Sequence, residues 1–161
     1  MGNAPSGISK YSIPYIYDMY AYKYYQEELD GELDIFAVET NNARSDIPSG
    51  EITYGDVYKA LPFDNYLCLV KIKGINIINY LSTYESSHFY ITAENSFADA
   101  SGINSYVKDS NSYYYLLIID YIAISDYYSS ILEIEKTYNN EDALPRNIFS
   151  RYLNGYPANA F

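Results

Sequence analysis

The sequence has no tryptophan, one cysteine and one histidine in 161 residues. A single cysteine, Cys68, cannot form an internal disulfide or supply a cysteine-based zinc site. A single histidine, His88, cannot provide the several imidazoles that a two-metal hydrolytic centre takes. A Ser-His-Asp triad would need the same histidine, and the chain has no G-x-S-x-G motif. We therefore predict that the chain by itself is not catalytic and holds no metal ion.

Positive charge is also scarce, with 10 Lys and Arg against 21 Asp and Glu, a net charge of -11 and a pI near 4.3. This field repels polyanions at long range, so nucleic-acid binding is not expected, and a small phosphate ester would need a locally placed cation. No apolar run approaches the ~20 residues of a membrane span. The N-terminus lacks the basic and apolar segments of a signal peptide.

What the chain does have is the composition of a folded domain, with 48% hydrophobic and 19% charged residues. Its length favours one domain at residues 12–161, preceded by a linker or terminal edge at residues 1–11. The 23 tyrosines are spread through every segment. We interpret most of them as amphipathic packing residues and not as an aromatic binding surface.

Hydrophobic spacing predicts alternating helices and strands. Ser12 is a candidate helix cap, Gly31 a candidate helix stop, and Thr53 and Asp56 have the spacing of a capping box. Residues 86–112 are irregular apart from a short strand at 89–91, and residues 120–128 are rich in turns. The mixture predicts an α+β fold of mixed α/β layers. The predicted helices cover residues 12–30, 53–60, 74–84 and 143–154, and the predicted strands cover residues 34–38, 66–72 and 113–119.

The most informative stretch runs from residue 41 to residue 74. It places Arg44 in a turn directly after a predicted strand, where α/β proteins commonly hold ligands. The planar guanidinium suits a bidentate contact with phosphate. Phe63, beside the helix-ending Pro62, could stack its ring on a planar base. The alternative from the residues alone is that Arg44 pairs with Asp46 and Phe63 fills the core.

The same stretch resembles the C-terminal domain of the 5′-nucleotidase family, which includes UDP-sugar hydrolases and cyclic-nucleotide phosphodiesterases. The family signature reads approximately N-x-G-G-x-R, G-x-I-T-x-x-D-V, P-F-x-N and, after a strand, T-G. The order of the motifs and the interval from Arg44 to Phe63 agree with it. The matching segments here are Asn41-Asn42-Ala43-Arg44, Gly50-Glu51-Ile52-Thr53-Tyr54-Gly55-Asp56-Val57, Leu61-Pro62-Phe63-Asp64-Asn65 and Lys73-Gly74.

The resemblance implies a fold with a mixed β-sheet and packed helices, and it implies roles for individual residues. Arg44 would contact the substrate phosphate, and Phe63 would stack on the base with Asn65 beside it. Tyr121, on a loop after the late strand, would complete the stack, with Asp126 as the accompanying carboxylate. Ser101-Gly102 would form a glycine turn on the substrate side, which adds Gly102 to the candidate binding residues.

Three departures from the signature bear on these roles. Asn41 and Asn42 replace the paired glycines before the arginine, although asparagine tolerates left-handed backbone angles better than most residues. Ile124-Ser125 replaces the two glycines of a G-G-D segment beside Tyr121. Asp64 replaces the glycine of P-F-G-N and puts a negative charge near the expected position of an anionic ligand.

The resemblance implies a nucleotide substrate-binding domain of a phosphoric ester hydrolase. Two divalent metal ions would belong to a separate N-terminal metallophosphoesterase domain, the expected partner, and not to this chain. Family members act on nucleotides outside the cytoplasm, so an extracellular, periplasmic or cell-surface location is expected. One alternative is a non-catalytic cell-surface interaction module that keeps the fold without nucleotide binding. Another, a self-standing enzyme, is opposed by the single histidine.

Overall fold

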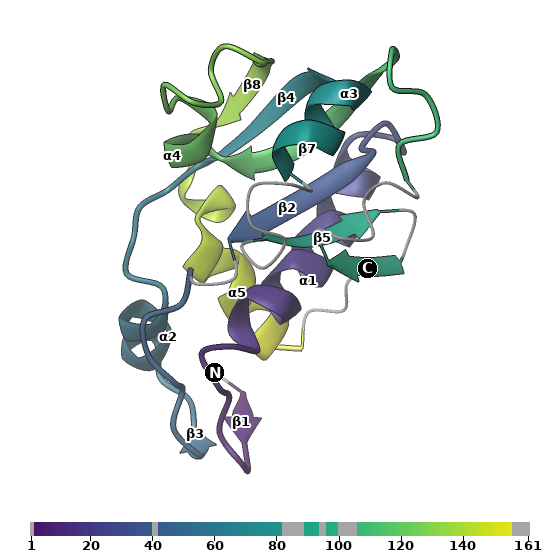
Figure 1. The fold of residues 1–161 in the computed structure, drawn as a ribbon. Helices are drawn as coiled ribbons and strands as arrows, with labels where there is room; N and C mark the ends of the chain where they lie inside the picture. The colour runs from purple at the N-terminus through teal and green to yellow at the C-terminus, as the bar shows by residue number, and fades with distance from the viewer. Residues whose placement is uncertain (1, 40–41, 82–88, 94–95, 100–105, 156–161) are drawn as a thin grey trace.

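The computed structural model describes residues 2–39, 42–81, 89–93, 96–99 and 106–155 (Figure 1). Its centre is a six-stranded sheet in the order β6-β5-β2-β7-β4-β8. β2 and β7 run parallel and every other neighbouring pair is antiparallel. The strands of this sheet are β2 (Ile35–Glu39), β4 (Leu67–Lys73), β5 (Phe89–Ala93), β6 (Ser96–Asp99), β7 (Tyr113–Ile119) and β8 (Leu132–Tyr138).

Helices pack on this sheet and on one another. α1 packs against β2, β5 and α5, α2 packs against α5, and α4 contacts β4, β7 and β8. The architecture is therefore α+β with a mixed sheet, as predicted from the sequence. The helices are α1 (Ile13–Glu28), α2 (Tyr54–Ala60), α3 (Gly74–Asn76) with a π-helical turn at Ile77–Leu81, α4 (Asp120–Ala123), a 3-10 turn at Glu141–Ala143 and α5 (Pro145–Leu153).

α1 begins and ends close to the predicted residues. Ser12 is its N-cap residue, but the Ser12 side chain makes no capping hydrogen bond, so that part of the prediction is wrong. Pro14 lies in the first turn, where its missing N–H has no helical partner to lose. After the last turn the backbone reaches φ 50° at Asp30 and φ 83° at Gly31. A left-handed angle ends the helix, and glycine adopts it without strain.

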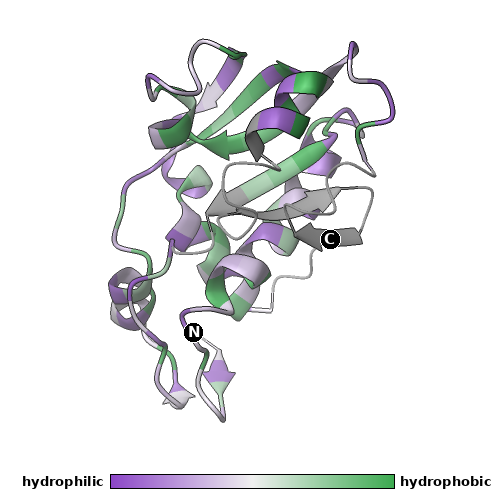
Figure 2. Ribbon diagram, viewed as in Figure 1, coloured by the Kyte–Doolittle hydropathy of each residue, from purple (hydrophilic) through white to green (hydrophobic). Residues whose placement is uncertain are grey.

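The core lies between the central strands and the helices. Leu116 and Leu117 of β7, Val70 of β4 and Phe36 of β2 have no exposed surface, and Figure 2 shows the central strands as the most hydrophobic part of the ribbon. Tyr17 of α1 meets the Phe36 ring edge to face, with 5.6 Å between centroids. Such burial of apolar surface is the main favourable contribution to folding. Cys68 is also buried in its strand, as predicted.

Several elements were not predicted. β6 and β8 form the two edges of the sheet, and the expected turn-rich segment contains the short helix α4. The predicted helix at residues 74–84 is α3 followed by the π-helical turn up to Leu81, and its remaining residues lie outside the described part of the chain.

The N-terminal residues also pair with the rest of the chain. β1 (Asn3–Ala4) pairs antiparallel with β3 (Gly50–Glu51), and Ile8 forms a bridge with Ile47. The Lys10 N–H donates to the Asp46 carboxylate at 2.8 Å. The domain boundary between residues 11 and 12 stays a prediction. Within the described residues, no helix is both long enough and apolar enough to cross a bilayer.

The capping box at the start of α2 is present, and it makes stability depend on pH. The Thr53 hydroxyl and N–H both donate to the Asp56 carboxylate, at 2.6 and 2.9 Å. These hydrogen bonds hold the pKa of Asp56 below its ordinary value of 3.8, because they favour the ionised form. A depressed pKa contributes stability above the ordinary value, and this contribution is lost as the pH falls through the folded-state pKa.

We therefore expect Asp56→Asn to lose less unfolding free energy than the wild type when the pH falls from about 5 to about 2. Denaturant unfolding at each pH measures the difference. Glu32→Gln, which removes an exposed carboxylate outside the capping box, is the matched control for the loss of one negative charge. Parallel profiles for the wild type and Asp56→Asn would contradict the assigned capping role.

Candidate functional site

Arg44 and Phe63 meet at the surface beyond the end of β2. Arg44 follows this strand, and its N–H donates to the Ala60 carbonyl at 2.8 Å, which ties its turn to the end of α2. Phe63 comes shortly after Ala60 in the chain. The guanidinium carbon of Arg44 lies over the Phe63 ring, 4.9 Å from its centroid. A cation above an aromatic face is attracted by the ring quadrupole. The structure thus brings together the two side chains that the sequence analysis singled out.

Phe63 does not fill the core. Its side chain is 44% exposed, so the interpretation of Phe63 as a core residue is wrong. Asp46 accepts a hydrogen bond from the Lys10 backbone, and its expected pairing with Arg44 stays a prediction. Phe63 therefore presents a large apolar surface to solvent beside an exposed arginine. An aromatic ring and a guanidinium at this spacing can receive a ligand that has both a flat apolar part and an anionic part.

Tyr121 and Asp126 come from α4 and the turn after it. The Asp120 N–H donates to the Tyr66 carbonyl at 2.8 Å, and Leu67 pairs with Ile119 across the sheet. These contacts place the backbone of Tyr121 beside the segment that follows Asn65. The Tyr121 side chain is 69% exposed.

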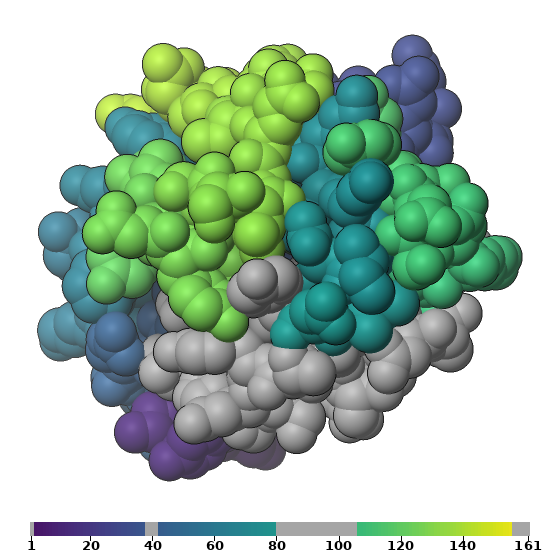
Figure 3. All heavy atoms as spheres, turned by 45° about the horizontal axis from the view of Figure 1, so that its top comes forward, coloured from purple at the N-terminus to yellow at the C-terminus, as the bar shows by residue number. Residues whose placement is uncertain are grey.

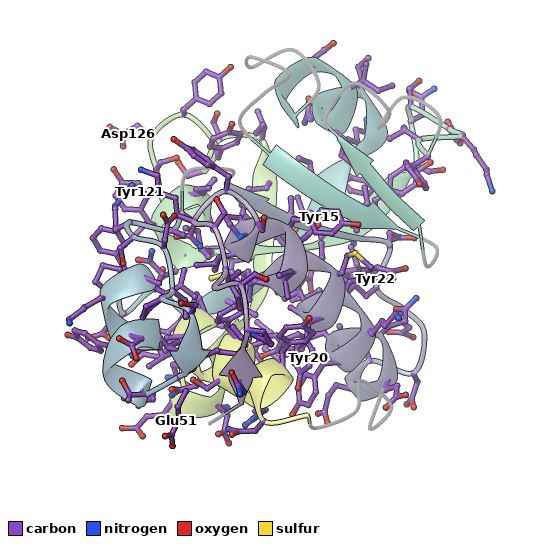
Figure 4. All side chains as sticks on the ribbon, turned by 90° about the horizontal axis from the view of Figure 1, so that it is seen from below. Tyr15, Tyr20, Tyr22, Glu51, Tyr121 and Asp126 are labelled. Carbon is purple, nitrogen blue, oxygen red and sulfur yellow. The ribbon has the colours of Figure 1, made fainter. Side chains whose placement is uncertain are left out.

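The side chain of Asp126 is exposed as well. Figure 4 shows Tyr121 and Asp126 at the outer margin of the molecule, on the side of α2. In Figure 3 the green surface of residues 120–131 borders the blue surface of the chain around α2. The two segments that carry Phe63 and Tyr121 are therefore neighbours at one end of the sheet.

A narrow gap that is too small to hold a water molecule lies between the loop of Phe63 and the start of α5. It is lined by Asn42, Leu61, Phe63, Asn65 and Pro145. Asn65 is half-buried, whereas Asn42 is 6% exposed and its side-chain nitrogen is buried without a hydrogen-bond partner. Asn42 thus stands beside Phe63 where the family signature has a glycine.

Arg146 of α5 is a residue of this region that the sequence analysis missed. Its side chain contacts the loop of Phe63. Nη1 donates to the Phe63 carbonyl at 3.1 Å, Nη2 forms an ion pair with the Asp64 carboxylate, and Nε donates to the Tyr54 hydroxyl at 3.2 Å. Burial disfavours the charged form, yet the hydrogen bonds with Asp64 and Tyr54 raise the pKa of Arg146 above its ordinary value. The negative charge expected at Asp64 is therefore paired.

The signal that could have found Arg146 is an arginine directly after Pro145 on the inward face of an amphipathic helix. A buried guanidinium needs hydrogen-bonding or ion-pair partners. Asp64, the acidic residue that replaces a glycine of the signature, was a candidate partner. Four other residues named in the sequence analysis lie outside the described residues: Asn41, His88, Ser101 and Gly102. Within the described part of the chain, no group of three or more His, Cys, Asp or Glu side chains could hold a metal ion.

A second cavity, of about 320 Å³, lies at the opposite end of the sheet. It lies where α1 ends and β2 and β7 begin, away from the loop of Phe63. Its polar groups include Gln26, whose amide oxygen accepts from the Leu33 N–H at 3.0 Å, and Asp34, whose carboxylate accepts from the Tyr115 N–H at 2.7 Å. These groups support the backbone at the start of β2.

Comparison with known proteins finds a matching family model and a related protein. The family described as "5'-nucleotidase, C-terminal domain" matches residues 16–158. A Treponema pallidum (strain Nichols) protein named "Probable 5'-nucleotidase" is 45% identical over 47 residues, which are 29% of this chain and 8% of that protein.

Two solved structures share the fold at low sequence identity. One is the 5′-nucleotidase precursor of Thermus thermophilus, with a TM-score of 0.60 and 17% identity. The other is a 5′-nucleotidase-type protein of Staphylococcus aureus, with a TM-score of 0.59 and 11% identity. The alignments cover 96% and 95% of this chain, and 36% and 37% of those two chains. This chain therefore spans about a third of the length of the solved structures it matches.

Proposed function

The chain belongs to the family of 5′-nucleotidase C-terminal domains, and from this membership we propose that it recognises the nucleotide substrate of a metal-dependent phosphoesterase. Arg44 holds the phosphate, Phe63 stacks on the base, and Tyr121 provides a second ring. Asn65 and Asp126 hydrogen-bond the base or the ribose, and Gly102, outside the described residues, is a further proposed binding residue. The observation that carries the proposal is the position of the Arg44 guanidinium 4.9 Å from the centre of the exposed Phe63 ring.

The positions of Arg44 and Phe63 suit contacts with different parts of a nucleotide. Arg44 covers one face of the Phe63 ring, so we place the base on the other face and the phosphate against the guanidinium. A guanidinium offers two parallel N–H donors to a phosphate. Because Arg146 pairs with Asp64, the carboxylate next to Phe63 repels an anionic ligand less than its formal charge suggests.

Hydrolysis belongs, in this proposal, to a separate domain of a longer protein. The proposed N-terminal metallophosphoesterase domain carries two divalent metal ions, which activate the attacking water and stabilise the charge on the phosphoryl group. Arg44 offsets part of that charge from this side, and closure of the two domains completes the site. A location outside the cytoplasm is part of the same proposal, by analogy with the family.

The direct test is a titration of the chain with adenosine and AMP, followed by NMR. We expect weak binding of both ligands, with amide shifts concentrated at residues 42–44, 63–65 and 120–126. AMP should bind more tightly than adenosine because only AMP reaches Arg44 with an anionic group. The proposal fails if both ligands leave these amides unshifted at millimolar concentration.

Tyr121→Ala tests the second ring. A pair of aromatic rings is typically worth about 0.5–1.5 kcal/mol, so the affinity for adenosine should fall roughly 2- to 12-fold. Tyr127→Ala removes a neighbouring exposed ring of the same segment, 47% exposed against 69% for Tyr121, and should leave the affinity unchanged. Equal affinities in wild type and Tyr121→Ala would remove Tyr121 from the proposed site.

One observation favours the alternative of a cell-surface interaction module. Ile124 and Tyr127, next to Tyr121, expose 66% and 47% of their side chains, which gives this segment an apolar surface beyond what a nucleobase needs. Exposed apolar patches often mark protein-binding sites. A chain that binds neither adenosine nor AMP would favour this alternative.

A further inference from the structure

Arg146 is a nearly buried charged side chain in the region around Phe63. It is 8% exposed, although arginine is rarely buried unless its donors are paired. A buried guanidinium is costly to leave without partners, so its contacts define the arrangement of the groups around it. Its side-chain partners among the described residues belong to the segment from residue 54 to residue 64.

The contacts fix the loop directly after the Phe63 side chain. One terminal nitrogen holds the Phe63 carbonyl at 3.1 Å, and the other holds the Asp64 carboxylate. The guanidinium lies over the Tyr58 ring, 5.0 Å from its centroid, and its Nε donates to the Tyr54 hydroxyl. A rigid fork that holds two consecutive residues restricts the backbone angles between them.

The partners of Arg146 are themselves anchored to α5. The Tyr54 hydroxyl donates to the Asn147 side-chain oxygen at 3.0 Å, and the Asn147 amide donates to the Glu141 carbonyl at 2.7 Å. A chain of hydrogen bonds therefore joins α2, the loop of Phe63 and α5. The loop carries no regular secondary structure of its own, so side chains must supply its order.

We infer that Arg146 is a positioning residue, which holds the Phe63 ring ready for a flat ligand by clamping the Phe63 carbonyl and the Asp64 carboxylate. This rests on the proposed binding role of Phe63. A ring held in its binding orientation loses less conformational freedom when the ligand arrives, which strengthens binding. The Asp64 carboxylate, which replaces a glycine of the signature, is the anchor of the clamp.

A positioning role for Arg146 and a general role in stability predict different ligand affinities when Arg146 and Phe63 are changed together. If Arg146 acts through the Phe63 ring, its removal has no effect on binding once that ring is absent. The effects of Arg146→Met and Phe63→Ala on ligand affinity should then be strongly non-additive, as expected of residues that act as a unit. Adenosine is the suitable probe, because an uncharged ligand responds little to the change in net charge.

The experiment compares the wild-type chain with Arg146→Met, Arg146→Lys and Asp64→Asn. Arg146→Met keeps an unbranched apolar side chain and removes the donors together with the charge over the Tyr58 ring. Asp64 has an exposed carboxylate, so Asp64→Asn loosens the clamp without disturbing the core and remains informative if Arg146→Met fails to fold. Arg151→Met is the matched control, because Arg151 lies on the same helix in an ion pair with Asp142.

Two readouts are taken for each variant. NMR order parameters of residues 63–65 should fall from about 0.85, typical of a rigid backbone, towards about 0.6 in Arg146→Met and partly in Arg146→Lys and Asp64→Asn. Adenosine affinity should fall roughly 3- to 10-fold when Arg146→Met is made in the wild-type chain, whereas Arg146→Met should cause no further loss in the Phe63→Ala background. Arg151→Met should leave both readouts at wild-type values.

The outcomes separate this inference from the proposed function. Unchanged order parameters in Arg146→Met and Asp64→Asn would overturn the positioning role, whatever the ligand does. Additive losses of affinity in Arg146→Met and Phe63→Ala would also overturn it. If the wild-type chain binds no adenosine, the proposed function fails, and the order parameters still decide whether Arg146 holds the loop.

Discussion

Arg44→Gln is expected to abolish most of the preference of this domain for AMP over adenosine. Hydrogen bonds to charged groups contribute about 1.5–3 kcal/mol, so AMP should bind roughly 10- to 150-fold more weakly. Adenosine has no phosphate, and its affinity should change much less. The ratio of the two dissociation constants is the quantity to measure, because it cancels any general loss of order that follows from removing the guanidinium from the Phe63 ring.

The control for Arg44→Gln is Lys59→Gln. Lys59 is exposed on the neighbouring helix α2, and its replacement removes the same charge without removing a proposed phosphate ligand. It should change the ratio only through long-range electrostatics, which salt screens over about 10 Å at 0.1 M. An Arg44→Gln chain that keeps the wild-type ratio would show that the phosphate binds elsewhere.

Phe63→Ala has the second large expected effect. Stacking of a base on an aromatic side chain is worth about 1–3 kcal/mol, so adenosine and AMP should both lose roughly 5- to 150-fold in affinity. The two losses should be similar because the ring contacts the base, which both ligands share. Calorimetric titration of both ligands tests this, and it separates Phe63 from Arg44 by the pattern of losses.

Stability should change little in Phe63→Ala, since the ring is 44% exposed. Tyr113→Ala, which removes a ring that is 59% exposed at the opposite end of β7, is the control for losing surface aromatic area. If Phe63→Ala instead unfolds the chain and Tyr113→Ala does not, the Phe63 side chain is needed for folding in spite of its exposure.

The central elements of the fold were predictable because their sequences carry strong periodic patterns. Residues 113–119 form a continuous apolar run and become β7, which is paired with a strand on each side. The edge strand β8 was missed for the opposite reason. Five of its seven residues are exposed, so Glu133, Ile134, Glu135, Lys136 and Thr137 show no buried face that alternation could reveal.

The candidate site was predictable only in part. The signature identified Arg44 and Phe63, and the structure brings the guanidinium within 4.9 Å of the ring centre. No local sequence pattern predicts the contacts of Arg146, because its partner Asp64 is 82 residues away in sequence. The pairing of Asp64 was unpredictable for the same reason, since the charge that pairs with it comes from a distant helix.

The central claim is that Arg44 and Phe63 together recognise a nucleotide. It is tested most directly by a structure of this chain in complex with AMP. We predict that the adenine ring stacks on Phe63 and that the phosphate lies within hydrogen-bond distance of the Arg44 guanidinium. AMP bound instead in the cavity lined by Tyr22, Asp34 and Lys108, or bound with its phosphate away from Arg44, would contradict the claim.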